Sequence, residues 1–254
     1  MSTIPSAEVV DGCKTFIPLE NNPDVLSYLC GNLSISQDLA FHDILSLSPE
    51  FVGEWYPRPC HALILLAHTP IYEAARSTIE PTITEYHSSG PHEPVLWMRQ
   101  TIGHACGLMA LLHIVFNLEG RRYVTPGSEL DTLLQQAIQL GPTERAQLLY
   151  DSKFLEEAHM DAASGGSSTA PSPRDENHHH FVAFVQEEGQ VWELNGGMNG
   201  PLLRGTLDQG EDLLSEKGLS LTVKDFLDAA EQDGHEQMSI VAVTGANAVA
   251  PRST

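Results

Sequence analysis

The chain has 254 residues, enough to bury the core of one sizeable domain, and its 34 acidic and 13 basic residues give a formal net charge of −21. Because no basic cluster interrupts this acidic surplus, the composition argues against binding to nucleic acid or to an anionic membrane surface. The longest apolar runs, at 62–67 and 108–116, are far shorter than the roughly 20 residues that cross a bilayer.

Cysteine usage and the amino terminus indicate the compartment. The four cysteines are widely spaced and form no C-x-x-C pair, and the first residues lack the basic and then apolar pattern of a secretion signal. We therefore predict reduced thiols and a cytoplasmic protein, with the nucleus as a second compartment. We also predict one monomeric domain over residues 1–254.

Helical and strand patterns follow one another without a regular βαβ order, which predicts an α+β fold. In the first half, Asn22 as N-cap, Pro23 at the first helical position and Gly31 past the end predict a short helix. Strands are expected next at 39–45 and 61–67, with a helical turn at 48–55, helical patterns on both sides of Pro81 within 70–87, and a helix that begins at Cys106.

The second half continues with helical patterns at 128–140 and 142–163. The stretch 164–177 is rich in Gly, Ser and Pro and predicts a mobile connection rather than a packed element. A β-hairpin at 181–186 and 190–195, a helix at 222–232, a strand at 239–244 and a loose tail over 245–254 complete the prediction.

Cys106 lies where a glycine-containing turn meets a long apolar run. A thiol at the first turn of a helix faces unpaired N–H groups and the positive end of the helix dipole, which lower its pKa and favour the nucleophilic thiolate. Gln100, six residues upstream, carries an amide that could donate to a developing oxyanion. These features favour a catalytic cysteine, whereas Cys13, Cys30 and Cys60 are interpreted as buried small hydrophobes.

A cysteine nucleophile needs a base, and His180 is the best placed of the twelve histidines because it lies where a strand leaves the flexible connection. His178 and His179 are nearer the loop and are expected to face solvent. His113 follows Cys106 by about two helical turns, too far to deprotonate it, and is interpreted as a core histidine. Adjacent strand residues face opposite sides, so no zinc site, other metal or cofactor is predicted from the histidine run.

Four blocks resemble the ubiquitin C-terminal hydrolases, papain-like cysteine peptidases that act at the C-terminal glycine of ubiquitin. "FIPLENNPDVLSYL" is similar to the family's opening "PLE-x-NP", and "YPRPCHALILLA" to its "VPRPV" entry into a central strand. "WMRQTIGHACGLMALLHIVFN" resembles the active-site block, and "HHHFVAFVQEEGQVWELNGGMNGPLLRG" the block with the base. The blocks follow the family order and together span roughly residues 16 to 243.

The resemblance implies a papain-like α+β fold, with a central antiparallel sheet flanked by helices on both sides. It implies Gln100 as oxyanion donor, Cys106 as nucleophile and His180 as general base. Asn195 stands at the family's triad aspartate and would orient His180, while His104 stands where the family has Asn or Ser and should matter little.

The resemblance also implies that residues 157–177 form the family's crossover loop, through which the ubiquitin tail is threaded. Small or unfolded leaving groups should then be preferred over bulky folded ones. The partner would be ubiquitin or a closely related modifier, drawn toward Cys106 by the acidic surface. An alternative of another class is a ubiquitin-binding module of the same fold, in which Asn195 leaves turnover negligible.

Overall fold

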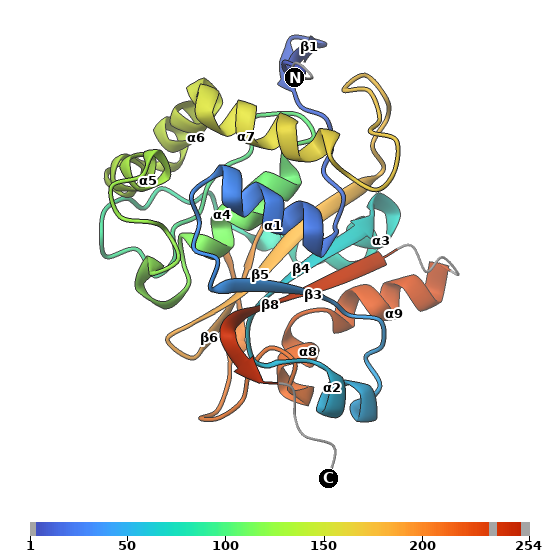
Figure 1. Ribbon diagram of the computed structural model, residues 1–254. Coiled ribbons are helices and arrows are strands. Elements are labelled where there is room, and N and C mark those ends of the chain that lie inside the picture. Colours follow the sequence, from blue (N-terminus) through green and yellow to red (C-terminus); the bar gives the residue numbers. More distant parts are fainter. Residues whose placement is uncertain (1–3, 234–237, 250–254) are drawn as a thin grey trace.

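The computed structural model describes residues 4–233 and 238–249, and a six-stranded antiparallel sheet forms its centre (Figure 1). The strand order is β3-β8-β4-β5-β6-β7. The innermost stretch of β4, from Ala62 to Leu65, is buried on both faces, which explains why it is a continuous apolar run rather than an alternating one. The strands are β3 (Leu39–Asp43), β4 (Arg58–His68), β5 (His179–Glu187), β6 (Gln190–Leu194), β7 (Leu202–Thr206) and β8 (Met238–Val249).

Helices cover both faces of this sheet, with a separate hydrophobic core on each side. The first layer consists of α1 (Pro23–Asn32), α4 (Cys106–Val115), α5 (Glu129–Gln139), α6 (Pro142–Asp151) and α7 (Lys153–Ser164). The second layer consists of α2 (Pro49–Trp55), α3 (Thr69–Arg76), α8 (Glu216–Leu221) and α9 (Lys224–Asp233). The predicted α+β class, with an antiparallel sheet between helices, is confirmed.

Shorter elements complete the described chain. A small hairpin of β1 (Glu8–Val10) and β2 (Cys13–Thr15) precedes α1, and two 3₁₀ turns occur at η1 (Glu80–Thr82) and η2 (Glu119–Arg121). The β1–β2 hairpin and β7 were not predicted. No helix in the described part of the chain is long and apolar enough to cross a membrane.

Helix α4 begins at the residue that the sequence predicts. Every residue of α4 is buried, so its unbroken apolar run reflects a helix enclosed on all sides rather than an amphipathic one. Its N-cap residue, Ala105, provides no side-chain hydrogen bond to the first turn. The N–H groups of that turn therefore remain free to interact with the Cys106 thiol.

Two predicted helix boundaries are wrong for local reasons. Gly31 lies inside α1, which ends only after Asn32. The pattern at 142–163 is two helices rather than one, because Ser152 ends α6 and its side chain accepts the N–H of Leu155 to begin α7. Of the helical patterns expected on both sides of Pro81, only α3 forms, and η1 is a single 3₁₀ turn.

The ends of two irregular segments also differ from the predictions. Helix α7 continues to Ser164, so the irregular part of the 157–177 segment begins at Gly165 and leads into β5 at His179. The tail predicted over 245–254 is strand up to Val249, because Gly245 pairs with Leu39 and Val249 with Arg58. Residues 250–254 lie outside the described part of the chain.

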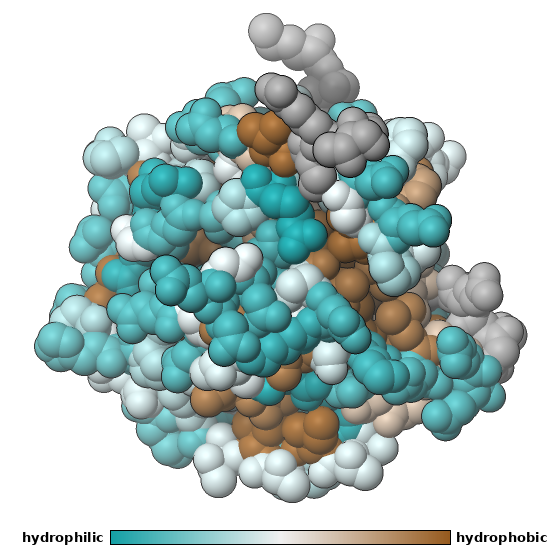
Figure 2. Space-filling model, turned by 90° about the horizontal axis from the view of Figure 1, so that it is seen from below, coloured by the Kyte–Doolittle hydropathy of each residue, from teal (hydrophilic) through white to brown (hydrophobic). Residues whose placement is uncertain are grey.

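An exposed apolar groove lies on the side that carries the second layer, where Figure 2 shows apolar side chains gathered between polar ones. It encloses about 830 Å³ between the segment after β3 and α9, and Leu45, Leu47 and Leu227 are among its lining residues. Leu47 and Leu227 pack against the second core, whereas Cys106 belongs to the first. The groove is therefore separated from Cys106 by the sheet.

Candidate active site

Cys106 is buried at the first residue of α4, with only 5 % of its surface exposed. Burial raises the pKa of its thiol above the usual value, although the backbone N–H groups of Phe181 and Gly107 stabilise the thiolate and act in the opposite direction. The helix start therefore interacts with the sulfur as expected. The expected net lowering of the pKa is wrong, because loss of solvent outweighs these hydrogen bonds.

His180 and Asn195 lie at neighbouring strand ends and are joined directly. His180 is the second residue of β5, and its Nε2 lies 2.9 Å from Oδ1 of Asn195, the residue that follows β6. The backbone N–H of Gly197 donates to the same Oδ1 at 2.8 Å. Since that N–H can only donate, Oδ1 accepts both bonds, and His180 Nε2 carries a proton. Nδ1 is then the basic nitrogen of the neutral ring.

The first layer brings Cys106 to the beginning of β5. Phe181, whose N–H approaches the Cys106 sulfur, directly follows His180 in the chain. A Cβ added to Gly107 would lie 3.4 Å from the Phe181 ring and 3.1 Å from Leu19, so this glycine permits close packing beside the thiol. Burial lowers the pKa of His180, so both the thiol and the imidazole favour their neutral forms in the free protein.

Gln100 is tied to the turn that carries Asn195. Its backbone N–H donates to the carbonyl of Gly196 at 2.9 Å, and a Cβ at Gly196 would lie 2.8 Å from the Gln100 nitrogen. The side-chain Nε2 donates to the Ile102 carbonyl at 3.0 Å, which fixes the amide while leaving its second N–H for another acceptor. The structure thus joins His180 directly to Asn195 and Gln100 to the next residue, Gly196, while Cys106 meets Phe181, the neighbour of His180 in the chain.

The structure confirms the interpretation of three other histidines. His113 is fully buried and accepts the N–H of Met98 at 3.0 Å, and burial lowers its pKa to about 3. His178 and His179 are exposed. His104 has a φ of 57°, a left-handed conformation that Asn and His both tolerate better than most residues.

The remaining cysteines divide into two groups. Cys30 and Cys60 are buried, as expected, and burial raises the pKa of Cys30 to about 12. Cys13 is exposed, so its interpretation as a buried hydrophobe is wrong. Its place in the short β1–β2 hairpin, outside both cores, explains the difference.

The segment 165–178 is tethered at several points (yellow loop between α7 and β5 in Figure 1). The Glu20 carboxylate accepts hydrogen bonds from the backbone and hydroxyl groups of Ser167 and Ser168, two of them at 3.0 Å from Ser167. These bonds lower the pKa of Glu20 to about 2, although burial opposes them. Farther along, Arg174 pairs with Glu8 at 2.7 Å. The expected mobile connection is therefore fastened to the amino-terminal segment.

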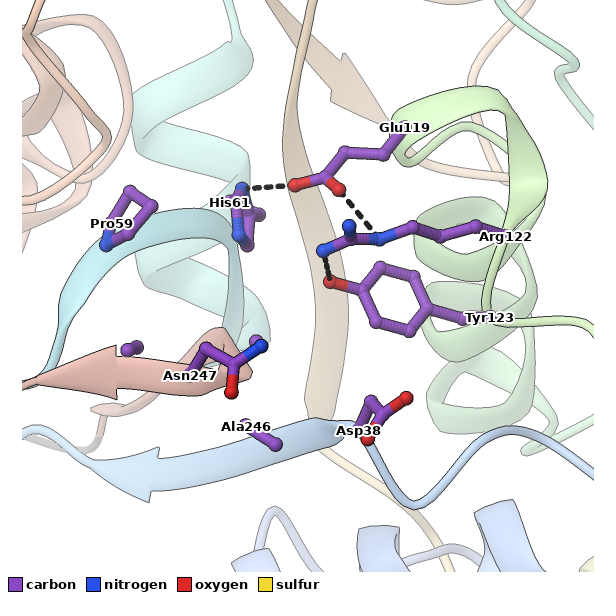
Figure 3. Close-up of a pocket in the computed structure, with 10 residues that line it drawn as sticks. Asp38, Pro59, His61, Glu119, Arg122, Tyr123, Ala246 and Asn247 are labelled. Atoms are coloured by element: carbon purple, nitrogen blue, oxygen red, sulfur yellow. Dashed lines mark hydrogen bonds and ion pairs between the residues drawn. The ribbon is translucent and has the colours of Figure 1, made fainter.

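A second pocket is lined by charged and polar side chains from several elements (Figure 3). It encloses about 390 Å³, and Glu119 bridges His61 at 3.1 Å and Arg122 at 2.6 Å along its wall. Its charged groups are thus largely paired with one another. None of the four predicted catalytic residues is among the residues that line it.

Sequence reasoning missed the residues that surround Asn195. The Tyr72 hydroxyl on α3 accepts the Asn195 Nδ2–H at 2.8 Å, and the Trp97 indole N–H donates to the backbone carbonyl of Asn195 at 3.0 Å. These partners are 123 and 98 positions away in the chain, so no local pattern indicates them. The signal that the sequence offers is a polar Asn at the end of a predicted strand.

Comparison with known proteins shows the family to which the chain belongs. The model of the ubiquitin carboxyl-terminal hydrolase family 1 matches residues 16–228. A ubiquitin carboxyl-terminal hydrolase of Aplysia californica is 35% identical over 191 residues, 75% of this chain and 86% of that protein. YUH1, a ubiquitin carboxyl-terminal hydrolase of Saccharomyces cerevisiae, is 28% identical over 229 residues, 87% and 92% of the two chains.

The fold is similar to that of the Trichinella spiralis UCH37 catalytic domain, solved with bound ubiquitin vinyl methyl ester. The TM-score is 0.66 at 18% identity, with 91% of this chain and 95% of that chain covered. The chain belongs to family 1 of the ubiquitin carboxyl-terminal hydrolases. It is a cysteine-type deubiquitinating enzyme that hydrolyses bonds at the C-terminus of ubiquitin. The binding-module alternative gains no support from these relatives.

Proposed function

We propose that Cys106 is the nucleophile of this hydrolase, His180 its general base, Asn195 the group that orients His180, and Gln100 the oxyanion donor. The observation that carries this proposal is the direct His180–Asn195 bond beside a helix-start thiol. The substrate is ubiquitin carrying an ester, thioester, amide or isopeptide at its C-terminal glycine. Solved relatives that hold ubiquitin vinyl methyl ester support ubiquitin as the partner.

The reaction follows from the protonation states at the site. His180 Nδ1 takes the thiol proton as Sγ bonds to the glycine carbonyl carbon, and the second Gln100 N–H stabilises the resulting oxyanion. The protonated His180 then gives its proton to the leaving oxygen, sulfur or nitrogen as that bond breaks. Water attacks the thioester with His180 as base, which releases the ubiquitin carboxylate and restores the Cys106 thiol.

Asn195→Asp is expected to increase kcat/KM by up to about tenfold, because a carboxylate stabilises the imidazolium that forms during attack. The pKa of His180 lies below its usual value here, and the new charge would raise it. Since the base must be neutral, the acid limb of the pH profile should move to higher pH. Asn195→Ala should be worse than either protein because it lacks the orienting acceptor. If the protein with Asn195 showed no detectable turnover and Asn195→Asp raised turnover a thousandfold or more, the proposal would be contradicted and the binding module favoured.

The segment 165–178 is the basis for the proposed substrate preference. Its first part is held by Glu20, next to the Leu19 that packs beside Gly107, and its end leads into His180. Both ends of the segment therefore border the nucleophile. A tethered loop at this position would admit an extended tail and small or unfolded adducts while excluding bulky folded ones.

Insertion of about ten Gly/Ser residues between Ala170 and Pro171 should allow cleavage of ubiquitin fused to a folded domain, with turnover of a small ubiquitin ester nearly unchanged. The two substrates should be compared by kcat/KM. The same insertion at Gly210, in another exposed loop, is the matched control and should change neither rate. An unchanged substrate size limit in the first insertion variant would contradict the loop model.

Glu20→Gln should make the segment several-fold more sensitive to limited proteolysis, because the charged acceptor of its tethering bonds is lost. The folded-state pKa of Glu20 is depressed, so the tether is complete above the usual carboxyl pKa and weakens only as pH falls toward about 2. Cleavage between 165 and 178 can be followed by intact mass. Glu129→Gln, on the exposed start of α5, should not change the rate of this cleavage. Equal cleavage rates in Glu20→Gln and Glu129→Gln would argue against the tether.

The proposal also includes a single monomeric domain and a cytoplasmic location, with the nucleus as a second compartment. One sheet shared by two helical layers supports a single domain. The four unpaired cysteines fit a reducing compartment. Size-exclusion chromatography with light scattering tests the monomer.

A further inference from the structure

Asn195 lacks the negative charge that an aspartate would bring to this position, yet a carboxylate lies two hydrogen bonds away from it. The Asn195 Nδ2–H donates to the Tyr72 hydroxyl oxygen at 2.8 Å, and that hydroxyl donates to Glu80 Oε2 at 3.2 Å. A phenol has a single proton, so a hydroxyl that donates to Glu80 presents only lone pairs to Asn195. The chain Glu80–Tyr72–Asn195–His180 is therefore directional.

We propose that Tyr72 and Glu80 are positioning residues for the catalytic base, in which Glu80 holds the Tyr72 proton and thereby makes Tyr72 the acceptor that orients and polarises the Asn195 amide toward His180. This inference rests on the proposed roles of His180 and Asn195. Hydrogen bonds in a chain polarise one another, so a carboxylate at the far end makes Asn195 Oδ1 a stronger acceptor. Through this chain, the Glu80 carboxylate supplies part of the negative polarisation that an aspartate in place of Asn195 would give.

The surroundings of Tyr72 hold this chain in place. Its ring packs against the rings of His180 and Phe226, with centroid-to-centroid distances of 4.8 Å and 6.3 Å. One helical turn later on α3, the fully buried Arg76 forms a bidentate pair with Glu193 of β6 at 2.7 and 2.8 Å. Asn195 lies two residues beyond Glu193, so this pair fixes α3 against the strand that leads to it.

Of the two carboxylates that act on Tyr72, Glu80 is the one whose negative charge is not compensated by a neighbouring cation in the described part of the chain. The charged groups that act on Tyr72 are Glu80, Glu193 and Arg76, and Glu193 is neutralised by Arg76. Glu80 forms no ion pair within the described residues. Burial and both carboxylates raise the pKa of the Tyr72 hydroxyl, which keeps it protonated, and Glu80 raises the pKa of His180 against the effect of burial.

The test measures kcat and KM on a ubiquitin C-terminal fluorogenic ester for Tyr72→Phe, Glu80→Gln and the double variant. Tyr72→Phe keeps the ring and should lower kcat about three- to tenfold, the effect of one neutral hydrogen bond, with KM unchanged. Glu80→Gln keeps an acceptor but removes the charge, and should lower kcat about threefold. The double variant should be no worse than Tyr72→Phe, because Glu80 acts through Tyr72.

Two further comparisons separate positioning from a general structural role. Glu73→Gln removes an exposed charge from the same helix and should leave kcat unchanged. In an Asn195→Asp background, Tyr72→Phe should change kcat by less than about twofold, since a carboxylate has no N–H for Tyr72 to accept. If Tyr72→Phe acted only through reduced packing, kcat would fall equally in the Asn195 and Asn195→Asp backgrounds, and that result would overturn the proposal. An unchanged kcat in Tyr72→Phe would overturn it as well. So would a double variant whose loss in kcat is the product of the losses in Tyr72→Phe and Glu80→Gln.

Titration of His180 by NMR gives a readout that does not depend on turnover. Its pKa should fall in both Tyr72→Phe and Glu80→Gln, and an unchanged value in both would overturn the relay even if the rates fell. Cys106→Ala is measured in the same series. Undiminished turnover in Cys106→Ala would refute the proposed nucleophile while leaving the titration as a valid test of the relay.

Discussion

Cys106→Ala is expected to abolish turnover of ubiquitin C-terminal esters and amides, with a loss of at least about 10⁴-fold in kcat, because no other group can form the thioester. Cys106 is also expected to be the residue that reacts covalently with a ubiquitin bearing an electrophilic C-terminus. Its sulfur lies beside the Phe181 N–H and the start of α4, whereas Cys30 lies within α1 and Cys60 within β4, both buried. Intact mass before and after labelling gives the stoichiometry.

Cys13 supplies the matched control for this experiment. It is exposed, so an indiscriminate thiol reaction would find Cys13 more readily than the buried Cys106. Cys13→Ala should label and turn over like the unmodified protein, and Cys106→Ala should retain ubiquitin binding without labelling. An adduct that persists in Cys106→Ala and disappears in Cys13→Ala would refute the assignment.

Gln100→Ala is expected to lower kcat about 100- to 1000-fold with little change in KM, because an oxyanion donor acts mainly in the transition state. The Gln100 backbone is fixed by Gly196, and one side-chain N–H is used by the Ile102 carbonyl. The second N–H is therefore held in a defined direction without a cost in reorganisation during the reaction.

Gln100→Glu is the matched control for side-chain volume. The ionised carboxylate has the same shape but no N–H to donate, and it would repel the oxyanion, so its loss in kcat should equal or exceed that of alanine. Ubiquitin affinity, measured on Cys106→Ala proteins with and without each exchange, should stay nearly constant. A defect confined to affinity would show that Gln100 contributes to binding and not to oxyanion stabilisation.

The sequence predicted those structural features of the candidate site that depend on local patterns. The change from a glycine turn to an apolar run located the start of α4 at Cys106, and the connection before the hairpin located His180. The direction of the Cys106 pKa shift could not be predicted in this way. It depends on burial among residues from several distant elements, and burial outweighs the helix start that the sequence reveals.

Long-range contacts explain what else was missed. Gln100 meets Gly196, and Tyr72 meets Asn195, only because the sheet and α3 bring distant segments together. The tether of the 165–178 segment has the same origin, since Glu20 is almost 150 positions from Ser167 and Ser168. A Gly/Ser/Pro-rich composition predicts irregular structure correctly but does not reveal whether such a segment is fastened.

The same segment divides the sequence into two parts that each carry two of the four proposed catalytic residues. Gln100 and Cys106 precede it, and His180 and Asn195 follow it. In the sheet, however, β3 and β4 from the first part alternate with β8 and β5 from the second. A break in the peptide backbone between 165 and 178 would therefore leave two interleaved fragments held by strand pairing and both cores. Such a nicked protein would remain one particle, but the loop that we propose to enclose the ubiquitin tail would no longer be closed.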